Sequence, residues 1–217
     1  MGSELTEIIF LTLQCAFVSA TLVFIPGIPL AYCLSRFSFK GKTFLLSLIS
    51  LPLVLPPTAV GYLMLDLLAR ESVLGSFLEG IGVEVILTPK AIIIAGATMS
   101  LPLVVRTAKV AFDGVSPQLE KMAWTLGYSP VKTFLKVTIP LAGKGLMAAF
   151  ILGFTRSMGE FGATVVLAGN IPGETRTISS AIFVAQQTGQ SDKAYFLIGV
   201  ASLVGFIAIL TSELLSK

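Results

Sequence analysis

The residues of this chain that could do chemistry are few, and two of them carry charge inside an apolar stretch. Arg156 and Glu160 stand four positions apart, a spacing at which a helix brings two side chains to one face as an ion pair. A charge near the centre of a bilayer costs about 3 kcal/mol even on lenient insertion scales, so such residues usually face a bundle interior or a water-filled path. The pair therefore predicts either a neutralised contact that only packs helices or a polar face that lines or gates a path.

The residues around this pair are mostly small, which would let neighbouring helices approach closely. Plain helix packing explains the glycines equally well when they are considered alone. The residues that we predict to form the pathway or gate are Arg156, Ser157, Gly159, Glu160, Gly162 and Thr164.

Other kinds of chemistry find little support. The chain has no His, which removes the commonest general base and the commonest zinc ligand. Cys15 and Cys33 are 18 residues apart, which is roughly 27 Å along a helix and too far for a disulfide. The run Gly41-Lys42-Thr43 resembles the end of a phosphate-binding loop, but Arg36 stands where its first Gly must be. We expect no catalytic residue, no metal site and no cofactor bound by this chain.

The elements that must position these residues are membrane helices. The composition is 54% hydrophobic and 12% charged, about half the usual charged share of about 25%, and the mean hydropathy is +0.90. A helix needs roughly 20 apolar residues to cross the hydrocarbon core. Five stretches qualify, at 8–35, 44–69, 90–112, 141–168 and 194–215. The sequence predicts an all-α integral membrane protein whose 217 residues form a single membrane domain.

Prolines indicate where these spans bend. Pro52, Pro56 and Pro57 lie within six residues of span two and must break or kink its helix. Span three contains Ser100-Leu101-Pro102, where we predict a second break. We read the fourth span as one long helix of about 28 residues.

Lys and Arg residues are divided unequally between the two sides of the predicted spans, and the cytoplasmic side is usually the richer one. The richer side holds Arg36, Lys40, Lys42, Arg106, Lys109, Lys121, Lys132, Lys136, Lys144 and Lys217, and the other side holds Arg70, Lys90, Arg176 and Lys193. This distribution predicts an N-terminus outside the cell, a cytoplasmic C-terminus and a cytoplasmic segment 113–139. The loops at 70–89 and 169–193 would face outward.

The cytoplasmic segment 113–139 is polar and predicts a helical hairpin. Ser116 followed by Pro is a typical helix start, and Glu120 in the first turn suits the helix dipole. Gly127 suits the left-handed position after a helix, and Ser129 followed by Pro starts a second short helix that we expect to end near residue 136. Taken alone, Glu120 could be an ordinary surface carboxylate. A compact polar hairpin between two spans nevertheless offers a docking surface to a partner in the water.

The pattern of this hairpin resembles the loop signature of permease subunits of binding-protein-dependent ABC importers. The signature is a Glu, a small residue, a Gly and an apolar residue before Pro, here Glu120, Ala123, Gly127 and Ile139-Pro140. The family's common Glu-Ala-Ala opening reads Glu-Lys-Met-Ala in this chain. The resemblance implies that the hairpin forms coupling helices that sit in a cleft of an ATPase subunit. The implied ATPase-coupling residues are Glu120, Ala123, Leu126, Gly127, Tyr128, Ser129 and Pro130.

The resemblance extends over residues 10–213, and within that family the chain is similar to molybdate permeases. It rests on the stretches 51–63, 100–109, 159–164 and 169–177. It implies import of molybdate, and often tungstate, with sulfate permeases as near relatives that match less well at 169–177. A secondary transporter is a less favoured alternative, because the sequence shows no two matched halves. A membrane-embedded enzyme is also disfavoured, because the sequence shows no nucleophile–base set.

The implied partners are a second copy of the chain, two ATP-binding cassette subunits that use ATP and Mg, and a periplasmic oxyanion-binding protein. Five spans are few for a closed path around an anion, which favours a homodimer with the path on its two-fold axis. No nucleic acid is expected, and the location is the inner membrane.

Overall fold

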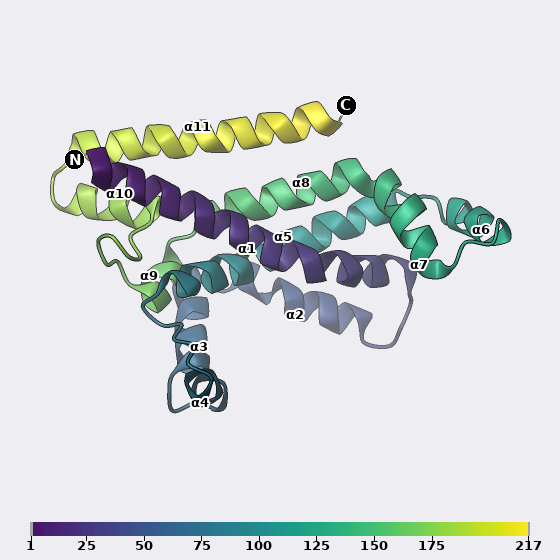
Figure 1. The fold of residues 1–217 in the computed structure, drawn as a ribbon, viewed down its shortest axis with the longest axis horizontal. Coiled ribbons are helices and arrows are strands. Elements are labelled where there is room, and N and C mark those ends of the chain that lie inside the picture. The colour runs from purple at the N-terminus through teal and green to yellow at the C-terminus, as the bar shows by residue number, and fades with distance from the viewer. Residues whose placement is uncertain (1, 217) are drawn as a thin grey trace.

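The computed structural model describes residues 2–216, with side chains described for residues 4–214. All regular elements in that range are helical, which confirms the all-α prediction (Figure 1). The elements are α1 (Gly2–Arg36), α2 (Lys42–Val54), α3 (Pro57–Leu68), α4 (Val73–Gly80), α5 (Pro89–Asp113), α6 (Pro117–Thr125), α7 (Pro130–Thr133), the π-helical turn η1 (Phe134–Thr138), α8 (Ile139–Met158), α9 (Gly162–Ala168), α10 (Ile178–Gln187) and α11 (Ser191–Ser216).

Four helical stretches are long and apolar enough to cross a membrane: Glu4–Arg36, Pro89–Asp113, Pro130–Met158 and Ser191–Leu214. The pair Lys42–Val54 and Pro57–Leu68 qualifies as a fifth span only when taken together, because the two helices meet at 111°. The bend falls at Leu55 and Pro56, which have extended backbone conformations. The proline-induced break predicted for span two is therefore confirmed.

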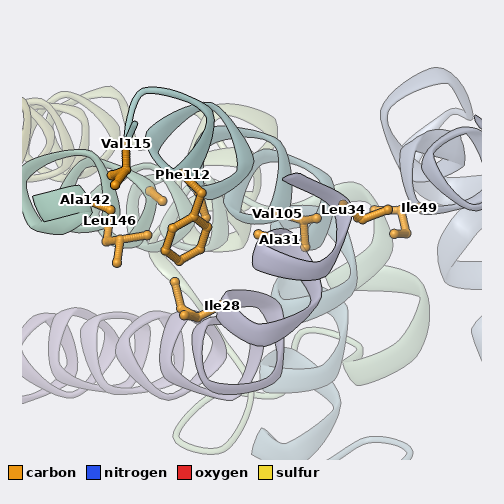
Figure 2. Packing of buried hydrophobic residues seen from close by; sticks show 11 residues of the cluster. Ile28, Ala31, Leu34, Ile49, Val105, Phe112, Val115, Ala142 and Leu146 are labelled. Atoms are coloured by element: carbon orange, nitrogen blue, oxygen red, sulfur yellow. The ribbon is translucent and has the colours of Figure 1, made fainter. Parts of the chain in front are cut away.

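The helices α1, α5 and α8 pack against one another and form the centre of the molecule. Buried side chains of these helices, with Ile49 of α2 and Val115, form one apolar cluster, which Figure 2 shows. The cluster comprises Ile28, Ala31, Leu34, Ile49, Val105, Ala108, Phe112, Val115, Ala142, Leu146 and Ala149. By contrast, α11 rests on α8 and α10 and has only 11% of its apolar window buried. Its outer face is therefore left for lipid or for another chain.

The break predicted in span three is wrong. Helix α5 continues from Pro89 through Pro102 to Asp113, and Pro102 is fully buried. Packing of α1 and α8 along both sides of α5 keeps the helix continuous across the residue that would otherwise break it.

The continuous helix predicted for span four is also wrong. Helix α8 ends at Met158, and α9 begins at Gly162 after Phe161, whose φ of −130° is not helical. The short helix α9 packs against α3 instead of extending α8. Gly162 permits this contact, since a Cβ there would lie 2.7 Å from Cβ of Pro57. Close packing against α3 therefore replaces the straight path that hydropathy alone suggests.

The hairpin and the two chain ends are arranged along the long axis of the molecule (Figure 1). The N-terminus lies at one end and the hairpin of α6 and α7 at the other, while α11 runs from the N-terminal end toward the hairpin's side. The segments 70–89 and 169–193 contain the short helices α4 and α10, which lie in the half away from the hairpin.

Candidate functional site

The first candidate site is the hairpin, whose central feature is the carboxylate of Glu120. Although Glu120 lies in the first turn of α6, only 3% of the residue is exposed. Arg36 at the end of α1 donates to it from Nε and Nη2, each 3.0 Å from Oε1. Thr138 Oγ1 donates to the same oxygen at 2.9 Å. Glu120 is therefore an internal anchor that joins α6 to α1 and η1, and it is not a surface carboxylate.

The turn of the hairpin follows the sequence pattern closely. Gly127 has a φ of +83°, and the amide of Tyr128 donates to the carbonyl of Ala123 at 3.0 Å. The hydroxyl of Ser129 accepts from the amide of Lys132 at 3.3 Å. The predicted left-handed glycine and the second cap are confirmed.

Two details of the hairpin differ from the prediction. Ser116 precedes α6, but its hydroxyl bonds the side chain of Gln118 and caps no amide. The second helix does not end near residue 136 as a separate element. It runs from α7 through η1 directly into α8, so Pro130–Met158 is one helical stretch.

The hairpin presents an apolar and positively charged surface. Met122, Leu126 and Val131 are 60%, 79% and 68% exposed, whereas Ala123 is buried. Lysines 121, 132 and 136 are also exposed, and the ammonium of Lys132 lies 4.2 Å from the centre of the Tyr128 ring. Since the carboxylate of Glu120 is neutralised internally, the solvent-facing charge of α6, α7 and η1 is positive. Such a surface suits a partner with apolar and acidic groups.

The second candidate site is the break between α8 and α9. The predicted pair is confirmed, because Arg156 Nη1 lies 2.6 Å from Glu160 Oε2. Glu160 is almost fully buried, and its Oε1 also accepts from the amide of Ala163 at 3.0 Å. Its carboxylate thus neutralises Arg156 and caps α9. Arg156 keeps 27% of its side chain exposed, so it is the charged member of the pair that faces outward from the packed helices.

The other predicted pathway residues mostly serve packing. Ser157 Oγ donates to the carbonyl of Gly96 on α5 at 3.0 Å, and Thr164 is buried. Gly162 lies against Pro57, while Gly159 is exposed at the end of α8. The structure therefore leaves Arg156 and Gly159 accessible beside the buried carboxylate of Glu160, and it turns Ser157 and Thr164 into the bundle.

Two charged residues that make buried or multiple contacts in the structure, Arg36 and Glu4, were not predicted as site residues from the sequence. Arg36 entered only as a charge in the topology count, and its partner Glu120 is 84 residues away. Glu4 pairs with Lys193 Nζ at 2.8 Å and with Arg176 Nη1 at 3.5 Å, which ties three segments together at the end of the molecule away from the hairpin. In the sequence, these charged residues differ from their surroundings only in standing next to apolar stretches. That pattern does not indicate which residues pair with them.

Comparison with known proteins identifies a family. The sequence model for the binding-protein-dependent transport system inner membrane component matches residues 27–215. The molybdenum transport system permease protein ModB of Escherichia coli K12 is 41% identical over 194 residues, covering 88% of this chain and 84% of the relative. The putative molybdenum transport system permease protein YvgM of Bacillus subtilis is 37% identical, with 96% and 92% covered. The sulfate transport system permease protein CysT of Salmonella typhimurium is 38% identical, with 81% and 64% covered.

Two solved structures share the fold. A chain of the MetNI methionine ABC transporter in an inward facing conformation has a TM-score of 0.75 at 17% identity, with 100% of this chain and 96% of that chain covered. A chain of a bacterial alginate ABC transporter has a TM-score of 0.74 at 17% identity, with 99% and 80% covered. At these identities the likeness concerns the fold alone.

Proposed function

Because this chain belongs to the family of inner membrane components of binding-protein-dependent transport systems, we propose that it forms the membrane path for molybdate, or for tungstate, in an ATP-driven importer. As a member of this family it is a multi-pass transport protein of the inner membrane and not an enzyme. The observation that carries the proposed substrate is the 41% identity to a molybdenum permease over 88% of the chain.

The proposed assembly contains two copies of this chain, two ATP-binding cassette subunits and one periplasmic binding protein. At most five spans are few for closing a path around an anion, which supports the pairing of two copies. The exposed apolar and basic surface of the hairpin supports docking of the ATPase there. A solved alginate ABC transporter of the same fold is in complex with a substrate-bound periplasmic protein.

The proposed orientation places the N-terminus outside and the hairpin and C-terminus in the cytoplasm. The positive charge of the hairpin supports a cytoplasmic location. The hairpin and the N-terminus also lie at opposite ends of the molecule (Figure 1), which agrees with three spans between them if α2 and α3 count as one span.

Sulfate is the second candidate substrate, since a sulfate permease is 38% identical. The molybdenum permease is the more similar of the two, at 41% identity over 88% of this chain against 38% over 81%, and this favours molybdate.

The test is the ATPase activity of the complete complex in proteoliposomes, with its binding protein loaded in turn with molybdate, tungstate or sulfate. Stimulation by molybdate or tungstate, with little by sulfate, is the expected result. Stimulation by sulfate alone would replace the proposed substrate, and failure of the chain to co-purify with any ATPase would contradict the proposed function.

A further inference from the structure

The end of α1 holds a charged group that the proposed transport path does not use. Arg36 is the last residue of α1, and its side chain is only 12% exposed. It points into the hairpin and not toward solvent, although a long basic side chain at a helix end normally reaches water. We propose that Arg36 is a positioning residue that couples movement of the hairpin to α1. This proposal rests on the proposed function, because it assumes an ATPase that moves the hairpin.

The guanidinium makes contacts in three directions. Nε and Nη2 donate to the carboxylate of Glu120, Nη2 donates to the carbonyl of Val115 at 2.8 Å, and Nη1 lies 3.4 Å from Ser35 Oγ. One side chain of α1 thus holds α6 by its first turn and also holds the loop that leads into it. Such a forked arrangement requires a planar guanidinium, because the single ammonium of a lysine presents its donors from one point.

A second set of contacts attaches the same end of α1 to α5. Ser35 Oγ donates to Asp113 Oδ1 at 2.6 Å, and Lys109 Nζ lies 2.5 Å from Asp113 Oδ2. Arg36 touches this set through Ser35. The hairpin, the end of α1 and the end of α5 are therefore joined by one continuous polar network.

The network also reaches α8. Thr138, which is fully buried, donates to Glu120 from the last residue of η1, immediately before α8 begins. A single π-helical turn inside an α-helix is frequently found at functional sites. A displacement of α6 is thus transmitted to α1 through Arg36 and to α8 through Thr138.

A purely stabilising role for the Arg36–Glu120 pair is the alternative. The stabilising role and the coupling role predict different transport by a double variant in which both charges are neutralised. Replacing Arg36 alone leaves a buried carboxylate unpaired, which can prevent folding in either case. Replacing both charges, as Arg36→Gln with Glu120→Gln, leaves no unpaired charge and lets the chain assemble, but the strong forked attachment is lost.

The test compares Arg36→Gln, Arg36→Lys and the double variant Arg36→Gln/Glu120→Gln in the complete complex in proteoliposomes. The readout is the amount of anion imported per ATP hydrolysed, together with co-purification of the ATPase subunit. The matched control is Arg70→Gln on the other side of the predicted spans, whose pair with Glu79 is 72% and 51% exposed. The control should leave the import-to-hydrolysis ratio unchanged, since exposed pairs contribute little.

The double variant is expected to assemble and yet to lower the ratio by about fivefold or more, the low end for coupling between sites. Arg36→Lys should give an intermediate ratio. A double variant that assembles with the wild-type ratio would overturn the proposal, as would an Arg36→Gln complex that imports normally per ATP. Both results leave the proposed function intact, whereas absence of ATP-driven import by the wild-type complex removes that function itself.

Discussion

At the scale of residues, two buried carboxylates organise the functional parts of this chain. Glu120 and Glu160 are each 3% exposed, and each pairs with an arginine. Each also accepts a hydrogen bond from a neighbouring helical element: Glu120 from Thr138 at the end of η1, and Glu160 from the Ala163 amide in α9. Both are therefore junctions between elements, and removing their partners should cost more than removing an ordinary surface charge.

The Arg156–Glu160 pair gives an asymmetric prediction. Arg156→Met leaves the buried carboxylate unpaired and should destabilise the protein by about 3 kcal/mol, the low end for buried pairs because Arg156 is partly exposed. The double variant Arg156→Met/Glu160→Gln should recover most of that loss, because the amide oxygen still accepts from Ala163. A double-mutant cycle of thermal unfolding and uptake measures the coupling. Additive effects in both assays would mean that the pair does not interact.

At the scale of elements, the two broken helices meet at α3 and α9. A Cβ at Gly61 of α3 would lie 2.8 Å from Cα of Ala163 and 2.9 Å from its carbonyl oxygen, so backbone meets backbone at this crossing. The crossing places Glu160 and the start of α9 beside the bend of span two. Glycine at this position is what allows α9 to leave the line of α8.

Gly61→Ala should therefore separate α3 from α9 and cost roughly 1–3 kcal/mol, as overpacking does. The control is Gly143→Ala in α8, where a Cβ would meet nothing within 4 Å. Differential scanning calorimetry of the purified proteins measures the unfolding temperature of each variant. Equal unfolding temperatures for the two variants would show that the α3–α9 contact is looser than described.

The hairpin turn provides the second prediction for an element. Gly127→Val should abolish assembly with the ATPase or transport, because a β-branched residue fits poorly at a φ of +83°. Gly127→Asn is the control, since Asn tolerates this conformation. If the Val variant co-purified with the ATPase and took up anion normally, the hairpin would not be the docking element.

At the scale of the whole molecule, the proposed topology counts the bent pair of α2 and α3 as one span, which makes five, and places the hairpin in the cytoplasm. Cysteines placed at 75–80 should label from outside intact cells, and a cysteine at 130 should not. The exposed native Cys33 is first replaced, and a C-terminal fluorescent-protein fusion should be bright. Labelling of position 130 from outside would reverse the orientation.

The membrane spans and the turn of the hairpin were predictable because both depend on local sequence. Hydropathy located the spans. The turn of the hairpin depends on the backbone conformation of Gly127 and on the side-chain hydroxyl of Ser129. The continuity of α5 at Pro102 and the break after Met158 were not predictable, because neighbouring helices decide them.

The buried state of Glu120 likewise depends on a residue 84 positions away. The contact of Arg36 with Glu120 was not predictable for the same reason, since no local pattern indicates which residue pairs with Arg36. The Arg156–Glu160 pair was found in advance because its two members are only four residues apart.

The most direct measurement of the central claim is molybdate uptake into proteoliposomes that contain this chain, its ATPase subunit and the binding protein. In vesicles whose hairpins face the interior, uptake should require ATP in the interior. It should persist in the presence of a proton ionophore and disappear when the ATPase subunit is omitted. Uptake that continues without the ATPase and collapses with the ion gradient would contradict the account and identify a secondary transporter instead.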